Sequence, residues 1–540
     1  MKKFLPDLIA ILAFIILSFA YFFPADIEGR ILFQHDTAAG VGAGQESKEY
    51  LERTGERTRW TNSIFGGMPT YQMSPSYDST TSLKGVEKVY RLFLPDYVVL
   101  TFIMMLGFYI LLRAFGISAW LAGLGGVIWA FSSYFFILIP AGHIWKFVTL
   151  AYIPPTIAGV VLAYRKKYLL GGIVTALFIA LQIQSNHIQM SYYFMFVILF
   201  FVGAYFEDAY KKKELPHFFK ASGVLALAAV VGVCINISNL YHTYEYSKET
   251  MRGKSELKQE GAAASQTSSG LDRDYITNWS YGIGETLTLL VPNVKGGGSG
   301  STMSQSEAAM AKANPMYNGI YSQLPQYFGE QPWTAGPVYV GAFVMFLFVL
   351  GCFIVKGPLK WALLGATIFS ILLSWGKNFM GLTDFFIDYV PMYNKFRAVS
   401  SILVIAEFTI PLLAIFALKE ILSKPDMLKQ EKNCRGVIAA LVLTAGVALI
   451  LAVAPGTFFS SFITTQEMTA LKQALPAEHL APFVANLTEM REAIIASDAW
   501  RSFFIIVIGC LFLFLYQLRK LKASFTLAGV ALLCLIDMWS

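Results

Sequence analysis

The stretch FQHDTAAGVGAGQE, residues 33–46, places His35 beside Asp36 shortly after the first apolar run and just before small residues that we expect to form a loop. A carboxylate within hydrogen-bond reach of a substrate hydroxyl can act as a general base, and a neighbouring imidazole can orient or tune it. Asp36 has a structural alternative, a cap on a helix that begins at Thr37. His35 can equally be a hydrogen-bonded structural histidine. Asp36 is therefore our candidate base, with His35 beside it.

Basic side chains at the same predicted membrane face are candidates for holding an anionic group. Arg397 and Lys395 stand in YNKFRAVSS, just before an apolar run, and Arg binds phosphate in a bidentate manner that Lys cannot match. His143 and Lys146 stand in the turn PAGHIWKF, which puts a Lys outside against the usual charge bias. The structural alternative for each is a side chain that anchors a helix end in the interface.

Polar residues also interrupt the apolar runs. The turn QIQSNHIQM contains Asn186 and His187 among several glutamines. Such a cluster at membrane depth faces a cavity or the interior of a helix bundle, so it either binds a polar substrate or joins helices by hydrogen bonds. Glu407 lies near the middle of a later run. It is too deep for chemistry at the membrane surface, which favours a role in helix packing or as a protonated structural group.

Composition indicates the elements that must position these residues. Of 540 residues, 56% are hydrophobic and 14% are charged, against about 25% charged in soluble domains. The N-terminal apolar run is followed by Pro24 rather than by a small-residue cleavage site, so we expect it to stay as a helix. We predict an all-α polytopic membrane protein with about thirteen transmembrane helices, near 8–23, 97–113, 118–139, 147–164, 168–185, 190–206, 221–239, 337–355, 359–375, 399–418, 436–453, 502–518 and 524–539.

The distribution of charge predicts the orientation. With Lys2 and Lys3 in the cytoplasm, nearly every short basic loop falls on the cytoplasmic side, as the positive-inside rule requires. The long polar segments then lie outside, at 24–96, 240–336, 376–398 and 454–501. The motif GxxxxGK[ST] is absent from the sequence, so chemistry outside the cytoplasm points to an already activated, lipid-linked substrate. We expect membrane lipids, and no nucleic acid, as partners.

The sequence also predicts the local structure of two outer segments. Residues 82–97 place Leu83, Val86 and Tyr90 at helical spacing with charges opposite, which is typical of a helix lying along the membrane face or packed on other loops. The stretch KGGGSGSTMSQSEAAMAKANP, residues 295–315, is of low complexity, and we expect it to be mobile.

Several motifs in order resemble a known family. They are the His35-Asp36 pair with Gln45, then WTNSIFGGMPTYQ beginning at Trp60, WSYGIGETLTLLVPN containing Glu285, GPVYVGAF and MYNKFRAVSSILV. They span residues 35–403, and their order and spacing are similar to those of the YfhO-like bacterial membrane proteins of the GT-C glycosyltransferase superfamily. The resemblance implies one GT-C-like transmembrane domain over 1–540 with structured loops at 24–96 and 240–336. The family usually continues into a C-terminal extracytoplasmic region, which we expect to be missing here.

The resemblance also implies an activity. GT-C enzymes transfer a sugar from a polyprenyl-phosphate carrier to an acceptor, usually with inversion, in the bacterial cytoplasmic membrane and on its outer face. Asp36 would be the base, and Glu285 would bind the acceptor or aid the base. Arg397, with Lys395, Lys146 and His143, would bind the donor phosphate. Gln45, Trp60, Asn186 and His187 would contact sugar or acceptor, which is a glycan, a glycolipid or a protein. No cofactor is required, although some members use a divalent metal. The alternatives are a transporter or flippase of lipid-linked sugars or other solutes, and a non-catalytic envelope scaffold.

Overall fold

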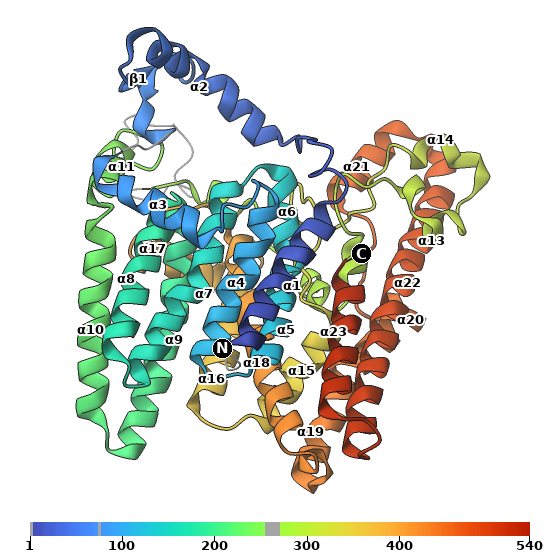
Figure 1. Ribbon diagram of the computed structural model, residues 1–540. Coiled ribbons are helices and arrows are strands. Elements are labelled where there is room, and N and C mark those ends of the chain that lie inside the picture. Colours follow the sequence, from blue (N-terminus) through green and yellow to red (C-terminus); the bar gives the residue numbers. More distant parts are fainter. Residues whose placement is uncertain (1–3, 74–76, 254–269, 540) are drawn as a thin grey trace. The chain divides into compact units, whose positions relative to one another are not determined.

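The computed structural model describes residues 4–73, 77–253 and 270–539, and these residues are mostly helical (Figure 1). The only named strands in the described residues are β1 (Trp60–Thr61) and β2 (Met68–Pro69), which pair antiparallel. Several helices are long and apolar enough to cross a membrane. The prediction of an all-α, multi-pass membrane protein is confirmed at this level.

The predicted number of spans is wrong. Among the described residues, 7 helices qualify by length and composition, or up to 9 if each of two bent pairs counts as one span. The qualifying segments are α1 (Leu5–Phe22), α7 (Ile144–Tyr164), α9 (Ile188–Lys212), α10 (Leu215–Cys234), Val399–Ser423 with α18 (Val404–Ser423), Glu431–Val453 with α19 (Glu431–Leu441) and α20 (Val447–Val453), and α22 (Ala477–Gln517).

The other predicted spans are helices that are bent or short. The bent pairs are α5 (Ala119–Ala130) with α6 (Ser133–Ala141), at 46°, and α16 (Pro358–Ser374) with the segment that contains α17 (Met380–Tyr389), at 109°. The short apolar helices are α4 (Val98–Ala114), α8 (Tyr168–Gln184), α15 (Ala342–Ile354) and α23 (Ala523–Trp539). These four helices have 17, 17, 13 and 17 residues respectively, fewer than the roughly 20 residues that cross a bilayer.

The described chain forms two compact units. Unit 1 contains residues 1–130 and 135–273, and unit 2 contains residues 131–134 and 274–540. In unit 1, 94% of the apolar window of α7 is buried. Close packing of α7 on α8 depends on glycine, because a Cβ atom on Gly159 would lie 2.3 Å from Thr175 Oγ1 and one on Gly171 would lie 2.5 Å from the Ala163 nitrogen. Small residues let two membrane helices approach in this way.

The polar segment after α1 is more regular than expected. The small residues after Asp36 are not a loop but part of the helix α2 (His35–Thr54), which ends at Gly55 in the left-handed conformation. Helix α3 (Thr81–Tyr90) ends before Phe93, because Leu92 and Phe93 have φ of 50° and 56°. The predicted amphipathic helix is thus shorter than residues 82–97, and its Tyr90 packs against Tyr152 of α7.

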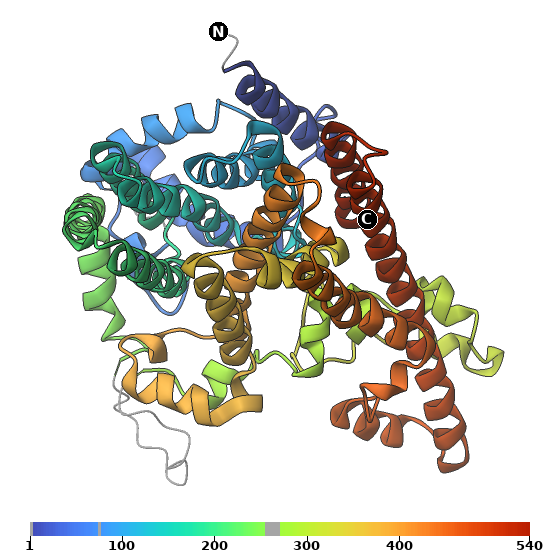
Figure 2. The ribbon, with the colours of Figure 1, turned by 90° about the horizontal axis from the view of Figure 1, so that it is seen from below.

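Unit 2 contains a lobe built around the first half of α22 (Figure 1). We define the lobe as residues 299–328, α21 (Thr465–Ala474) and the part of α22 before Asp498. The segment expected to be mobile is folded here, with a capping box between Thr302 and Gln305. It packs into a hydrophobic cluster of Met303, Ala309, Tyr317, Tyr321, Leu471, Phe483, Leu487, Met490 and Ile494. Figure 2, which looks along the spans, shows α17 from the side.

Candidate functional site

Asp36 lies in the first turn of α2, and this turn is docked on the connection between α6 and α7. Gln34 Nε2 donates to the Ile139 carbonyl at 2.6 Å, and Thr37 Oγ1 donates to Gln34 Oε1 at 2.9 Å. Gly142 has a φ of +80°, and a Cβ atom there would lie 2.9 Å from the Thr37 nitrogen and 3.1 Å from Asp36 Cβ. Only glycine fits such a position without strain. Gln34 is at the N-cap position, so Asp36 is not a cap.

The Asp36 carboxylate faces two imidazoles. Its Oδ2 atom is 3.1 Å from His143 Nε2, and its Oδ1 atom is 3.5 Å from His35 Nδ1. The side chains of Asp36 and His143 are 56% and 49% exposed. A carboxylate oxygen has more than one acceptor site, so contact with His143 leaves Asp36 able to accept a further hydrogen bond. The pair can therefore take a proton from a bound hydroxyl group.

Two further predicted residues belong to the same group. Lys146 lies in the first turn of α7 and is buried. His187 precedes α9, and its Nδ1 atom is buried without a hydrogen-bond partner among the described residues. Burial, with smaller contributions from the charges of Lys146 and His143, lowers the pKa of His187 to about 3. The His187 imidazole is therefore neutral at pH 7. We call Asp36, His35, His143, Lys146 and His187 the Asp36 group.

Helix geometry explains why these residues meet. Helices α7 and α9 both begin at this end of unit 1 because α8 returns between them. His143 and His187 occupy the N-cap positions of α7 and α9, and Asp36 lies in the first turn of α2. Helix N-termini carry a partial positive charge, so the group can hold an anion as well as remove a proton.

Asn186 makes contacts between helices rather than toward the Asp36 carboxylate. It has a φ of 60°, and its Oδ1 atom accepts a hydrogen bond from Asn239 Nδ2 at 3.1 Å. In the same region, Thr156 Oγ1 donates to Gln182 Oε1 at 3.2 Å. Of the two interpretations of the polar turn, hydrogen bonding between helices is the one seen for these residues. A role for Asn186 in binding sugar stays a prediction.

Gln45 and Trp60 lie farther along the same polar segment, and neither contacts Asp36 among the described residues. Gln45 donates to Glu49 on α2 at 2.8 Å. Trp60, in β1, is 52% exposed and donates to Asn62 Oδ1 at 3.1 Å. Glu46 was not found from the sequence, yet its carboxylate joins the hairpin to α2, accepting from Thr61 Oγ1 at 2.5 Å and from the Asn62 nitrogen at 2.8 Å.

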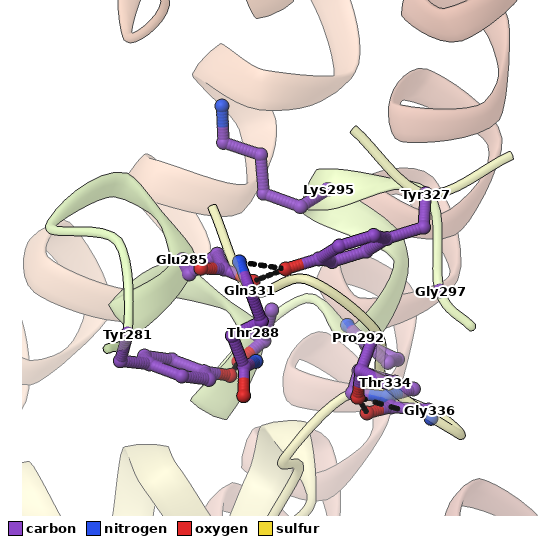
Figure 3. A pocket seen from close by; sticks show the side chains of 11 residues that line it. Tyr281, Glu285, Thr288, Pro292, Lys295, Gly297, Tyr327, Gln331, Thr334 and Gly336 are labelled. Carbon is purple, nitrogen blue, oxygen red and sulfur yellow. Dashed lines mark hydrogen bonds between the residues drawn. The ribbon is translucent and has the colours of Figure 1, made fainter. Parts of the chain in front are cut away.

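Glu285, in unit 2, lies in a small pocket (Figure 3). It is only 2% exposed. Its carboxyl group accepts from Tyr327 OH at 2.6 Å and from the Gly282 nitrogen at 2.7 Å. Burial raises the pKa of Glu285, against the lowering effect of these hydrogen bonds. Its partners hold residues 327–331 against the short helix η3 (Gly284–Leu289).

The Glu285 pocket is too small for a sugar ring. The space open to the centre of a water molecule is about 10 Å³, which is about one water. Lys295 also lines the pocket, and its ammonium lies 4.2 Å from the Phe459 ring centroid and 4.8 Å from that of Phe328. Burial lowers the pKa of Lys295, while the charges of Glu285 and Glu330 act in the opposite direction.

Arg397 and Lys395 belong to unit 2 and stand just before the span that contains α18. Arg397 donates to Tyr275 OH at 2.6 Å, and its guanidinium carbon is 5.3 Å from the Tyr275 ring and 5.9 Å from the Trp279 ring. Burial lowers the pKa of Lys395. These contacts orient the Arg397 guanidinium group among aromatic side chains.

The most strongly bonded cation of the lobe was not found from the sequence. Arg491 is fully buried in α22, and it donates to both carboxylate oxygens of Glu467 at 2.7 Å and to the Phe462 carbonyl at 2.6 Å. Its role is to join α21 to α22. One sequence signal could have found Arg491: it is an arginine in a helical segment that continues into an apolar span.

Searches for a metal site and for relatives return no match. In the described ranges, no group of three or more His, Cys, Asp or Glu side chains could hold a metal ion. No family model, curated protein or solved structure matches the chain.

Proposed function

We propose that this protein is a membrane glycosyltransferase of the GT-C type, which moves a sugar from a polyprenyl-phosphate-linked donor to an envelope acceptor. The observation that carries the proposal is the 3.1 Å contact between Asp36 Oδ2 and His143 Nε2, with Lys146 buried three residues after His143 in the first turn of α7. The motifs that resemble the YfhO-like family support the same assignment.

In this reaction Asp36 is the general base. It takes the proton of the acceptor hydroxyl as the hydroxyl oxygen attacks the anomeric carbon and the bond from that carbon to the lipid phosphate breaks. The departing phosphate binds at Lys146 and at the N-terminal end of α7, where its negative charge favours the charged form of the amine. His143 holds Asp36 in place. The pocket around Glu285 is too enclosed to bind an acceptor, so Glu285 supports the transfer by ordering its loop.

Exposed apolar residues lead from the end of α1 to Asp36, which suits a lipid-linked donor. Ile27, Ile31 and Phe33 are 75%, 87% and 80% exposed. An apolar tail can lie along such side chains while its phosphate stays at the membrane boundary. We place the site on the extracytoplasmic face of a bacterial cytoplasmic membrane, with the N-terminus inside, on the strength of the charge distribution between the spans.

The test compares Asp36→Asn with Glu52→Gln, a matched control at an exposed acid on the same helix. Sugar release from a short-chain polyprenyl-phosphate-sugar, mixed with an envelope extract, should fall about 10²- to 10⁴-fold in Asp36→Asn. Binding of the donor should remain, and Glu52→Gln should match the unmutated protein. Equal turnover in both variants would remove Asp36 from the chemistry.

The bent spans favour a second candidate, a transporter of lipid-linked sugars. Broken helices often line transport sites, and α5 with α6 bends by 46°. A transporter moves the labelled donor across proteoliposomes without releasing its sugar, whereas a transferase releases sugar only when acceptor is present. The same preparation therefore distinguishes the two functions.

A further inference from the structure

Basic side chains gather at the end of unit 1 opposite to the Asp36 group, where α7 and α9 end and α8 and α10 begin (Figure 1). The two turns are joined there, because His217 Nε2 donates to the Tyr164 carbonyl at 2.8 Å and Lys166 Nζ donates to Glu214 Oε1 at 2.9 Å. We define the basic patch as the seven basic and three acidic side chains of these turns, Arg165, Lys166, Lys167, Lys211, Lys212, Lys213, Lys220, Glu207, Asp208 and Glu214.

The acids of the basic patch neutralise only part of its charge. Each acid is paired with one lysine, and the three ion pairs are Lys166–Glu214, Lys211–Glu207 and Lys212–Asp208. Arg165 donates to the Ala114 carbonyl, and the Lys220 ammonium lies 4.7 Å from the centroid of the Tyr168 ring. Lys167 and Lys213 are exposed, and neither ammonium has an ion pair or a hydrogen bond among the residues that the structure describes. Two lysines beside the Lys166–Glu214 pair are therefore open to an anion.

The backbone of the turns does not explain why lysine stands at position 213. Lys166 and Lys213 have φ of 66° and 57°, a region that favours glycine. The ion pair with Glu214 accounts for Lys166. A cation also complements the negative end of a helix dipole, but Lys211 and Lys212 already supply this in the last turn of α9. The charge of Lys213 is thus available to a partner outside the chain.

The basic patch continues directly into apolar surface. Leu169, in the first turn of α8, and Phe219, on α10, are 78% and 62% exposed. Helix α10 is long and apolar enough to cross a membrane, and only 22% of its apolar window is buried. Such a helix faces hydrocarbon, while lysines at its end reach the headgroup layer. A partner that fits both surfaces carries a negative group above apolar chains.

We propose that the basic patch is a binding site for an anionic phospholipid. Lys167 and Lys213 hold the phosphate on either side of the Lys166–Glu214 pair, and the acyl chains lie along the exposed apolar side chains of α8 and α10. Basic pockets between membrane helices bind anionic headgroups in this way. An acidic protein or a free phosphate would match the charge but would leave the apolar surface unused. The site lies at the other end of the helices from Asp36 and does not depend on the sugar-transfer reaction.

The experiment measures lipid binding to the full chain in detergent by native mass spectrometry. Phosphatidylglycerol and phosphatidylcholine with the same acyl chains are the two probes. The unmutated protein should bind phosphatidylglycerol more tightly. In the double variant Lys167→Gln/Lys213→Gln, affinity for phosphatidylglycerol should fall about 10- to 30-fold, as expected for two lysines near an anionic headgroup, and affinity for phosphatidylcholine should not change.

Two further double variants separate the site from general charge and from misfolding. Lys211→Gln/Lys212→Gln changes the net charge equally but removes lysines that are already paired, so it should bind phosphatidylglycerol nearly as well as the unmutated protein. Lys167→Arg/Lys213→Arg keeps both charges and should retain binding. An equal loss in both glutamine variants would overturn the assignment to Lys167 and Lys213.

Two other outcomes would overturn the lipid itself. Equal affinity of the unmutated protein for both lipids would show that the headgroup charge is not recognised, and would leave the patch to an acidic protein. Displacement of phosphatidylglycerol by excess inorganic phosphate would identify a site for a free anion.

Discussion

The Asp36 group in unit 1 and the Glu285 pocket in unit 2 place a carboxyl group in opposite environments. The Asp36 side chain is 56% exposed and faces imidazoles, whereas Glu285 is 2% exposed and accepts from a tyrosine hydroxyl and a backbone N–H. An exposed acid is open to substrate. A buried acid favours its protonated form and orders the chain around it. Only the first arrangement suits a base that acts on an external hydroxyl.

The largest effect that would sharpen this comparison is expected at Gly142. Gly142→Ala adds a Cβ atom 2.9 Å from the Thr37 nitrogen and moves the first turn of α2, and a displacement of about 1 Å can cost about 100-fold in rate. Sugar release should fall by that order. Gly40→Ala on α2 is the control, since nothing lies within 4 Å of its Cβ position. Full activity in Gly142→Ala would show that the docking of Asp36 is irrelevant to transfer.

A smaller effect, on stability alone, is expected at the buried acid. Tyr327→Phe removes the donor to Glu285 Oε1 and the acceptor of the Gln331 N–H. An unsatisfied buried polar group costs about 1–3 kcal/mol. Thermal unfolding in detergent should detect this loss, while Tyr389→Phe, at a residue 75% exposed, should leave stability unchanged. A loss of donor turnover without a loss of stability would give the pocket a direct catalytic role.

A third effect is a pH dependence of stability that begins in unit 1. Burial lowers the pKa of His187 from 6.5 to about 3, so between these values the unfolded chain binds a proton that the folded chain does not. The free energy of unfolding should therefore fall as the pH falls through this window, by about 1 kcal/mol per pH unit. His187→Gln should flatten this slope in thermal unfolding measured across the window. An unchanged slope in His187→Gln would place the titration elsewhere.

The contribution of Glu285 to the free energy of unfolding should have the opposite pH dependence. Its pKa is raised by burial, so the contribution of its protonated form is complete below the pKa of 4.5 of an unperturbed Glu and is lost as the pH rises through the folded-state pKa. The two regions thus limit stability from opposite sides of the pH scale.

The membrane body was the part best predicted from sequence, because apolar composition alone marks a segment that leaves water. Each predicted window corresponds to apolar helix, yet composition does not show where a helix ends. Gly341, which precedes α15, has a φ of 97°, and the apolar residues before it gave no sign that they are not helical. The predicted window 337–355 is therefore longer than α15 (Ala342–Ile354).

The polar regions were predicted less well, because their order depends on residues far away in the chain. The Gly- and Ser-rich stretch before Pro315 folds against α22, with Asn314 N–H donating to Asn486 Oδ1. No local pattern reveals such a partner. Likewise, the sequence suggested Asp36 and His143 for two different roles. Their contact depends on the turn at Gly142, where the chain before α7 meets the first turn of α2.

The length of α22 has a mechanical consequence. At 41 residues and about 1.5 Å per residue, it is a continuous rod of about 60 Å, and its first half holds the lobe through Arg491 while its second half is apolar. A tilt of the buried half therefore swings the lobe through an arc as a stiff lever would. A span that is longer than the local bilayer is thick can tilt to match it, and such a tilt of α22 would change the angle at which the lobe stands.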